Sequence, residues 1–254
     1  MSKFLDVALK AISVAEKITL SSYHKRPRAR LKSDNTPVTA ADRTAEREIA
    51  AIIREAFPEH GILGEEFGRK GGRSVEFMWL IDPIDGTKNF VGQIPLWGNL
   101  LALWHEGEMI LGVSNMPMMG ERLWAHKGHG AFLNGKRVRV SSTSRLDQSM
   151  ISYGSLGSFK QIGMEPRIVE LIQTCKRQRA FGDLWPYHLL ACGKLDIVIE
   201  AAIKSVDVAP FVCIIREAGG ATCDLQGNPF DFGISSFVAT NGRLHQAVMR
   251  RMSS

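Results

Sequence analysis

The fold is decided by the stretch WLIDPIDGTKNF, residues 79–90, in which an apolar run meets two acids, a glycine and a threonine. Residues 75–81 are rich in aromatic and β-branched side chains, which predicts a buried strand that ends where the acids begin. Gly86 permits backbone conformations that other residues resist. We therefore expect a short, rigid bend that presents Asp82 and Asp85 to one point.

This acidic bend has two interpretations. Two carboxylates held close together either gain a raised pKa or bind a cation, and oxygen-only ligands favour Mg²⁺. Asp-Pro and Asp-Gly are also common in solvated turns, so the stretch alone fits either interpretation. Three further acids, Asp42, Glu65 and Asp207, also lie where apolar runs end. This shared placement favours one site, although spacing alone does not show that the acids converge.

Length and composition indicate an ordinary globular protein. The chain has 254 residues, of which 44% are hydrophobic and 23% charged, so one large layered domain or two packed halves are both possible. A net charge of +6 could indicate nucleic-acid binding, but the basic residues are scattered and accompany no recognised binding motif. We expect a small phosphorylated substrate, attracted by the positive field, rather than nucleic acid.

The four cysteines form no Cys-x-x-Cys pair and lie mostly among apolar residues, which indicates buried thiols in a reducing compartment and argues against a zinc site. We find no cleavable leader pattern and no apolar run of membrane-spanning length. The sequence therefore predicts a cytoplasmic protein with no membrane association.

Periodicity divides the chain near residue 140. The first part, 1–140, is expected to hold helices over 3–22 and from Asp42 to Pro58, with Thr39 as the N-cap of the second helix. Antiparallel strands over 96–104, 109–113 and 122–125 should follow, with a hairpin turn at Asn134-Gly135. The second part, 141–254, alternates strands and helices, with strands at 150–153 and 195–200 and helices at 166–175, 184–192 and 211–218. We expect the two parts to pack as one catalytic unit.

Four motifs in order carry a resemblance to a known family. They are Val38-Thr39-Ala40-Ala41-Asp42, Gly64-Glu65-Glu66, Asp82-Pro83-Ile84-Asp85-Gly86-Thr87, and Val206-Asp207-Val208-Ala209 with Glu217-Ala218-Gly219-Gly220 downstream. The sequence resembles the inositol monophosphatase family of Mg²⁺-dependent, lithium-sensitive phosphatases, over nearly its whole length. The resemblance implies a layered α-β-α-β-α fold and a homodimer. One departure is Val206, where the family usually has tryptophan, and another is Pro210, where a small residue is common.

The resemblance also implies roles for individual residues. Two or three Mg²⁺ ions would be held by Glu65, Asp82, the carbonyl of Ile84, Asp85 and Asp207. The attacking water would lie near Glu65 and Thr87, with Thr87 oriented by Asp42 and no covalent phosphoenzyme. Phosphate oxygens would accept from the amides of Gly86 and Thr87. Lys32 matches a basic residue near the metal site in some relatives.

Substrate choice rests on residues further along the chain. The closest resemblance is to the histidinol-phosphate phosphatase branch, through Pro95-Leu96-Trp97-Gly98, Gly120-Glu121-Arg122-Leu123-Trp124 and Arg179-Ala180-Phe181-Gly182-Asp183. Histidinol phosphate carries an ammonium and an imidazole, so Asp183 and Glu200 are plausible acceptors for it. Arg179 is a further candidate substrate-binding residue. In the simpler alternative, Asp183 pairs with Arg179 and only shapes the pocket.

Other functions remain open at this point. The second candidate is an inositol-1-phosphate or broad sugar-phosphate phosphatase, and a bisphosphate-specific enzyme is the third. A non-catalytic, metal-binding regulatory or RNA-associated protein would fit the high pI of about 9.3. The presence of Asp42, Glu65 and Thr87 together favours an enzyme.

Overall fold

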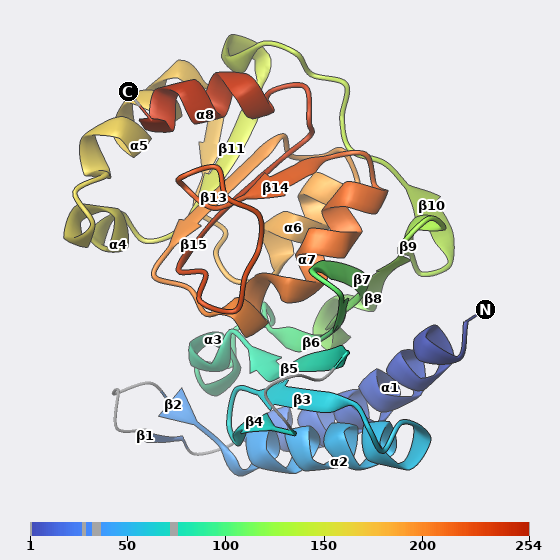
Figure 1. The fold of residues 1–254 in the computed structure, drawn as a ribbon. Helices are drawn as coiled ribbons and strands as arrows, with labels where there is room; N and C mark the ends of the chain where they lie inside the picture. Colours follow the sequence, from blue (N-terminus) through green and yellow to red (C-terminus); the bar gives the residue numbers. More distant parts are fainter. Residues whose placement is uncertain (1, 27–28, 32–36, 72–75, 254) are drawn as a thin grey trace.

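The protein is built from five layers, seen one above another in Figure 1. The computed structural model describes residues 2–26, 29–31, 37–71 and 76–253. Two helices cover the outer face of an eight-stranded sheet, two more lie between that sheet and a five-stranded sheet, and three cover the far face. This arrangement confirms the layered α-β-α-β-α fold expected from the sequence.

The first layer consists of α1 (Lys3–Tyr23) and α2 (Ala40–Ala56), close to the helices predicted. Each helix buries an apolar face against the large sheet, in a cluster that includes Ile12, Ile49 and Trp79. Thr39 caps α2 as expected, because its hydroxyl accepts from the amide of Ala41 at 3.1 Å.

The eight-stranded sheet has the order β10-β9-β8-β7-β6-β5-β3-β4 and is antiparallel except where β3 pairs with β5. Its strands are β3 (Gly61–Gly64), β4 (Gly68–Lys70), β5 (Phe77–Asp85), β6 (Gly98–His105), β7 (Glu108–Met116), β8 (Glu121–His126), β9 (Gly130–Leu133) and β10 (Lys136–Val138). The predicted meander is confirmed, as is the Asn134-Gly135 hairpin turn, whose φ angles of 49° and 78° are both left-handed. A separate pair, β1 (Arg30–Leu31) and β2 (Pro37–Val38), flanks the sheet.

The predicted end of the central strand was wrong, because β5 does not stop at the first acid. The strand continues to Asp85 through a bulge, with Asp82 opposite Leu100 and Asp85 opposite Gly98. The bulge has its own partner, since the side chain of Asn99 donates to the carbonyl of Pro83 at 2.8 Å.

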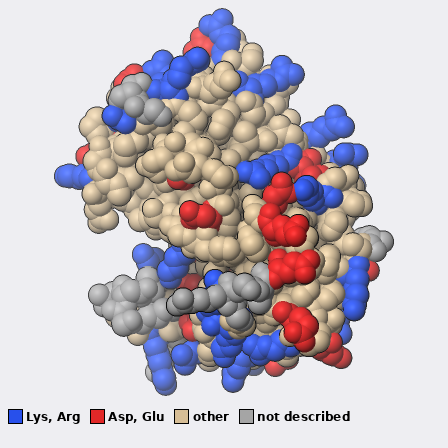
Figure 2. Space-filling view, in the orientation of Figure 1, with Lys and Arg blue, Asp and Glu red and all other residues tan. Residues whose placement is uncertain are grey.

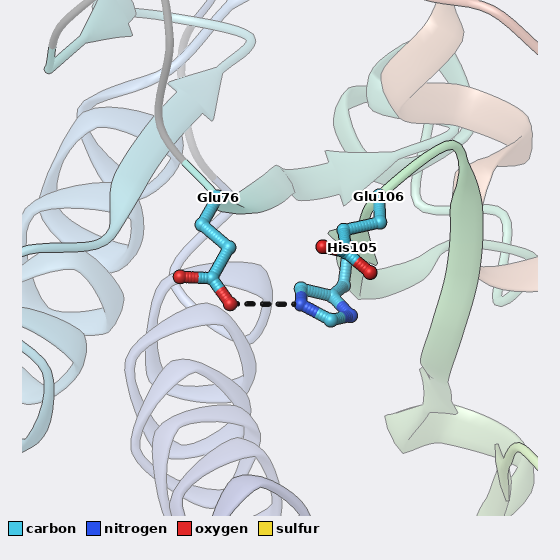
Figure 3. Close-up of side chains that lie close together, drawn as sticks. All are labelled: Glu76, His105 and Glu106. Carbon is cyan, nitrogen blue, oxygen red and sulfur yellow. Dashed lines mark hydrogen bonds and ion pairs between the residues drawn. The ribbon is translucent and has the colours of Figure 1, made fainter.

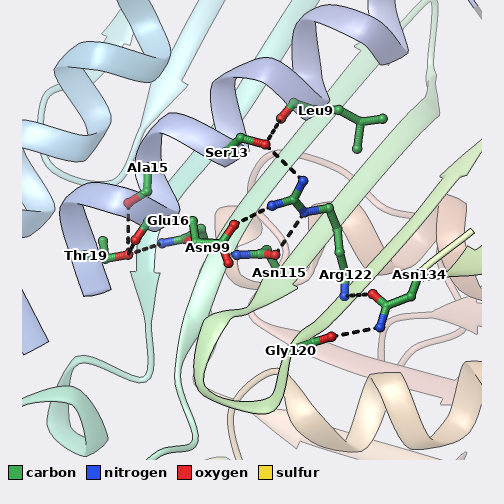
Figure 4. A network of polar contacts seen from close by, with 10 residues as sticks. All are labelled: Leu9, Ser13, Ala15, Glu16, Thr19, Asn99, Asn115, Gly120, Arg122 and Asn134. Atoms are coloured by element: carbon green, nitrogen blue, oxygen red, sulfur yellow. Dashed lines mark hydrogen bonds and ion pairs between the residues drawn. The ribbon is translucent and has the colours of Figure 1, made fainter. Parts of the chain in front are cut away.

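A buried polar network ties this bulge to α1 (Figure 4). The amide of Asn99 also lies 3.3 Å from the hydroxyl of Thr19, and Asn115 donates to Asn99 at 3.2 Å. Arg122 continues the network by donating to Asn115 and to Glu16 at 3.0 and 2.5 Å. The acidic bend is therefore bonded directly by Asn99 and, through Asn99, belongs to a network that joins α1, β6, β7 and β8.

The second sheet has the order β12-β11-β13-β15-β14, with parallel pairs on either side of β11 and antiparallel pairs on either side of β15. Its strands are β11 (Met150–Tyr153), β12 (Arg177–Arg179), β13 (Ile197–Ala201), β14 (Ala221–Cys223) and β15 (Ser236–Thr240). The remaining helices are α3 (Thr87–Val91), α4 (Leu156–Gln161), α5 (Glu165–Thr174), α6 (Trp185–Ala191), α7 (Ser205–Glu217) and α8 (His245–Ser253), and the 3₁₀ turns are η1 (Pro117–Met119) and η2 (Leu146–Gln148).

The central helix α7 starts earlier than predicted, at Ser205 rather than at residue 211, with Pro210 inside it. Almost all of its residues are buried, because it lies between the two sheets. It approaches β7 so closely that a Cβ on Gly112 would lie 2.1 Å from the carbonyl oxygen of Pro210. Tertiary packing thus outweighs the local disadvantage of an internal proline.

The expected boundary at 140/141 falls between the last strand of the first sheet and the first strand of the second. That the two parts pack as one catalytic unit stays a prediction. Among the described residues, no helix combines the length and the apolar character needed to cross a bilayer.

Candidate active site

Three carboxylates that the sequence separates by up to 125 positions meet beside the bulge. One oxygen from each of Asp82, Asp85 and Asp207 lies within 4.8 Å of the others. Asp82 and Asp85 come from the end of β5, and Asp207 comes from the first turn of α7. The same cleft is lined by Glu65, Ile84 and Thr87. The predicted metal-ligand residues therefore all lie in one place.

Backbone hydrogen bonds fix the orientation of two of these acids. The amide of Ile84 donates to Asp82 at 3.0 Å, and the amide of Lys204 donates to Asp207 at 2.8 Å as part of the cap of α7. Glu65 is positioned by its backbone, whose amide donates to the carbonyl of Ile81 at 3.0 Å. The carboxylates are thus held by strand and helix ends rather than by loops.

A lysine that the sequence did not single out lies in the same cleft. The ammonium of Lys204 lies 3.1 Å from an oxygen of Glu65, so it forms an ion pair with one of the predicted metal ligands. In the sequence, the only indication that Lys204 lies in the site is its position three residues before Asp207. A basic residue there gains meaning only once β3 and α7 are known to meet.

Burial and mutual repulsion raise the pKa of these acids. The pKa values of Asp82 and Asp85 lie well above the usual range, first because of burial and then because of neighbouring carboxylates. Burial likewise raises the pKa of Asp207 to about 6. Asp85 also has a buried Oδ2 atom without a hydrogen-bond partner. Closely spaced oxygen donors with an unsatisfied member fit one or more hard divalent cations, which would relieve the repulsion.

The glycine after the second acid opens a short helix beside the cluster. Gly86 has a φ of 80° and precedes α3. A Cβ on Gly86 would lie 3.0 Å from the carbonyl oxygen of Leu96. Glycine is therefore required here by conformation and by space. The Gly86 and Thr87 residues line the cleft, next to the carboxylates.

Thr87 and Asp42 are arranged differently from the expected pair. The hydroxyl of Thr87 donates to the carbonyl of Ile84 at 3.0 Å, while Asp42 accepts from the amide and the hydroxyl of Thr39 at 2.8 and 2.6 Å. Within the described ranges, no hydrogen bond joins Thr87 to Asp42. The Oδ1 atom of Asp42 is buried without a partner, and burial raises the pKa of this carboxyl to about 6.

Asp183 faces the cluster from the other side of the cleft. It accepts from the side-chain amide of Asn89 at 2.6 Å, and a Cβ on Gly86 would lie 3.4 Å from its carboxyl carbon. Arg179, its partner in the simpler alternative, is exposed and donates to the carbonyl of Gln178 at 2.7 Å. The contact with Asn89, 94 residues away in sequence, was not predicted.

Glu200 is the second acid on this side, near the end of β13. It shares a cleft with Asp183 and Tyr187. Burial, followed by the charge of Asp183, raises the pKa of Glu200 to about 8, and burial raises the pKa of Asp183 as well. Lys32, the last predicted site residue, lies outside the described residues.

A different acidic group lies at the opposite end of β5. Glu76, His105 and Glu106 approach one another there, with His105 Nε2 3.1 Å from an oxygen of Glu76 (Figure 3). Both glutamates are exposed and the ring of His105 stacks on Phe77. This group is separate from the cleft and shares none of its residues.

The raised pKa values predict that the metal-free protein loses stability as pH rises. A carboxyl whose pKa is higher in the folded state binds its proton more tightly there, so its contribution disappears as pH passes through the folded pKa. Glu200 alone should cost about 2 kcal/mol between pH 6.5 and 8.5, or roughly 5 °C in Tm.

Thermal unfolding in EDTA across this range checks the prediction, and added Mg²⁺ should restore Tm most at the upper end. The substitution Glu200→Gln should reduce the slope in EDTA. A Tm that stays flat or rises from pH 6.5 to 8.5 without metal would contradict the assigned pKa shifts.

Comparison with known proteins places this site in context. The model of the inositol monophosphatase family matches residues 1–254. A histidinol-phosphatase of Mycobacterium tuberculosis is 39% identical over 231 residues, which cover 88% of this chain and 87% of the relative. A fructose-1,6-bisphosphatase/inositol-1-monophosphatase of Thermotoga maritima is 36% identical over 218 residues, covering 84% and 81%. The solved structure of a Thermotoga maritima IMPase superimposes with a TM-score of 0.88 at 31% identity, covering 99% of this chain and 97% of that one.

Proposed function

We propose that this chain, which belongs to the inositol monophosphatase family, hydrolyses L-histidinol phosphate to L-histidinol and phosphate. Like other members of this family, the protein is a phosphatase that acts on phosphoric monoesters. The choice of substrate is supported by one observation above all. The half-buried Asp183 and the buried Glu200 lie beside the carboxylate cluster, where the alcohol part of a bound monoester would be.

Mg²⁺ is the cofactor that this donor set fits. Glu65, Asp82, Asp85, Asp207 and the carbonyl of Ile84 would hold two or three ions, which neutralise phosphate charge and lower the pKa of water. The protein has no need of a covalent intermediate in this scheme. Its own groups bind the phosphate through the Gly86 and Thr87 amides, and orient the attacking water through Glu65 and Thr87.

The Thr87 hydroxyl needs an acceptor to take this role. In the structure it donates to Ile84, a carbonyl that we assign to the metal ions. The free Oδ1 atom of Asp42 is a buried acceptor that could replace this carbonyl when ions are bound. We therefore keep Asp42 as the residue that orients Thr87 in the working enzyme.

The leaving alcohol supplies the specificity. A histidinol group presents an ammonium, and a buried carboxylate gains a charge-assisted hydrogen bond from it. Asp183 is held in a fixed position by Asn89, and Glu200 is desolvated, so both would exchange a raised pKa for an ion pair. A neutral polyol offers these two acids no comparable interaction.

The second candidate is a phosphatase of inositol-1-phosphate or other sugar phosphates. The hydroxyls of Ser155, Ser158 and Tyr187 line the same cleft and could bind a polyol. The Thermotoga maritima relative, named for such substrates, gives this candidate a further reason.

Other expectations from the sequence stay predictions. They include a homodimer and a cytoplasmic location, and histidinol phosphate as substrate would give the enzyme a place in histidine biosynthesis. The remaining non-catalytic or RNA-associated alternative finds little support in the charge distribution. On the face shown in Figure 2, Lys and Arg side chains lie in several separate groups rather than in one continuous stripe.

A panel of phosphate monoesters tests the proposal. Purified protein with Mg²⁺ should release phosphate from histidinol phosphate with a kcat/KM about tenfold or more above that for inositol-1-phosphate, fructose-1,6-bisphosphate or glycerol-2-phosphate. EDTA should stop the release, and Mg²⁺ should restore it. Preference for inositol-1-phosphate would establish the second candidate instead.

A further inference from the structure

Two sulfur atoms and an imidazole nitrogen meet on the far side of the second sheet, away from the carboxylate cluster. The thiol of Cys223, at the end of β14, lies 3.6 Å from His245 Nε2 and 3.5 Å from the sulfur of Met249. His245 and Met249 are four residues apart on α8, so both face the strand. Cys223 is 4% exposed, and the other two are half-buried.

The contact of His245 Nδ1 with Thr240 orients the imidazole ring toward the thiol. His245 Nδ1 lies 3.3 Å from the hydroxyl oxygen of Thr240, which also accepts from the amide of Gly242 at 3.2 Å. We assign Nδ1 as the protonated nitrogen, since Thr240 then serves as acceptor for both. The lone pair of Nε2 is then directed at Cys223. In metal-binding histidines, a hydrogen bond from the other ring nitrogen fixes the ring in the same way.

We propose that Cys223, His245 and Met249 form a binding site for one Cu(I) ion. Thiolate and thioether ligands select soft metals, and a Cys-His-Met set suits Cu(I) better than the oxygen-seeking Mg²⁺. Bonds of about 2.0–2.3 Å to a central ion, arranged trigonally, separate such donors by about 3.5–4.0 Å. The observed separations of 3.5 and 3.6 Å approach these values before any ion is present.

Binding exchanges one proton for the ion. The single proton of the Cys223 thiol can be donated to the Met249 sulfur or to His245 Nε2, and burial raises the pKa of this thiol to about 11. On binding, the S–H bond breaks, a sulfur–copper bond forms, and the proton leaves to solvent. Burial lowers the pKa of His245, so its ring is neutral at pH 7 and able to ligate. The copper stays Cu(I), and the exchange requires no oxidant or reductant.

The same contacts also suit plain core packing. Cys223 belongs to an apolar cluster with Leu225, Val238 and Leu244, where a buried thiol is common. Packing alone, however, requires neither the histidine nor its fixed tautomer. The two accounts differ in whether the three side chains bind metal together.

Anaerobic Cu(I) titration against the chelator bicinchoninate tests the site, with native mass spectrometry for stoichiometry and Tm as a second readout. One Cu(I) per chain should be withdrawn from the chelator, and binding should raise Tm by mass action. Cys223→Ser should weaken binding by about 100-fold and the volume-conserving Met249→Leu by about tenfold.

The matched control is Cys192→Ser, because this half-buried thiol has no comparable histidine and methionine among its described contacts. This control should bind Cu(I) like the parent. The site is overturned if the parent leaves copper on the chelator, or if Met249→Leu, which keeps the fold, binds as tightly as the parent. The copper assignment would also be overturned if the protein bound Zn²⁺ more tightly than Cu(I) and Met249→Leu left the Zn²⁺ affinity unchanged.

Discussion

The substitution Asp85→Asn should reduce Mg²⁺-dependent phosphate release by about 1000-fold, to near background. Asp85 lies among the carboxylates of Asp82 and Asp207, and its Oδ2 atom is buried without a partner. An amide removes the charge that the cation needs and presents a donor nitrogen to neighbouring acids. Steady-state kcat/KM on the best monoester, measured over a range of Mg²⁺ concentrations, gives the loss.

Stability separates lost metal binding from lost folding. Because the buried repulsion is relieved, metal-free Asp85→Asn should be at least as stable as the parent, while the rise of Tm with Mg²⁺ should disappear. The exposed Asp147→Asn, whose parent residue pairs with Arg145, serves as control and should keep both activity and the Mg²⁺ effect. Substantial activity in Asp85→Asn at saturating Mg²⁺ would remove this residue from the metal site.

The second large effect is expected on substrate choice. Asp183→Asn should lower kcat/KM for histidinol phosphate by about 10–100-fold, the value of one charged hydrogen bond, and change kcat/KM for inositol-1-phosphate by less than about threefold. Asparagine is the suitable replacement because residue 183 has a φ of 49°, which asparagine tolerates and alanine does not. Paired kinetics on the two substrates measure the selective loss.

Asn89 provides a second test of this position. Asn89→Ala removes the donor that holds Asp183 without removing the charge, so the loss on histidinol phosphate should be smaller than that of Asp183→Asn. Equal losses on both substrates in Asp183→Asn would reduce this acid to a structural role.

Local chemistry made much of the fold predictable. The apolar periodicity of α1 and the Thr39 cap of α2 are features of consecutive residues, and both were confirmed. The start of α7 was missed because Pro210 disfavours a helix locally, whereas burial between two sheets stabilises it. The same limit applies to β5, whose bulge depends on Asn99 of the neighbouring strand.

The site residues, too, were predictable only where local sequence marks them. Asp82 and Asp85 were recognisable because acids at a strand end are unusual, but their meeting with Asp207 requires the topology. The pairs Lys204–Glu65 and Asn89–Asp183 join residues that are 139 and 94 positions apart. No local pattern marks such contacts. The cluster of Cys223, His245 and Met249 was missed for this reason too, since α8 was not predicted at all.

In the proposed reaction, Asp183 and Glu200 select the substrate by binding its ammonium group. The most direct measurement compares kcat/KM of the parent enzyme for histidinol phosphate and for its analogue without the amino group, which keeps the imidazole and the phosphate. Loss of the ammonium should cost about 10–100-fold in the parent and little in Asp183→Asn. Equal kcat/KM values for the two compounds in the parent would mean that these acids do not recognise the ammonium.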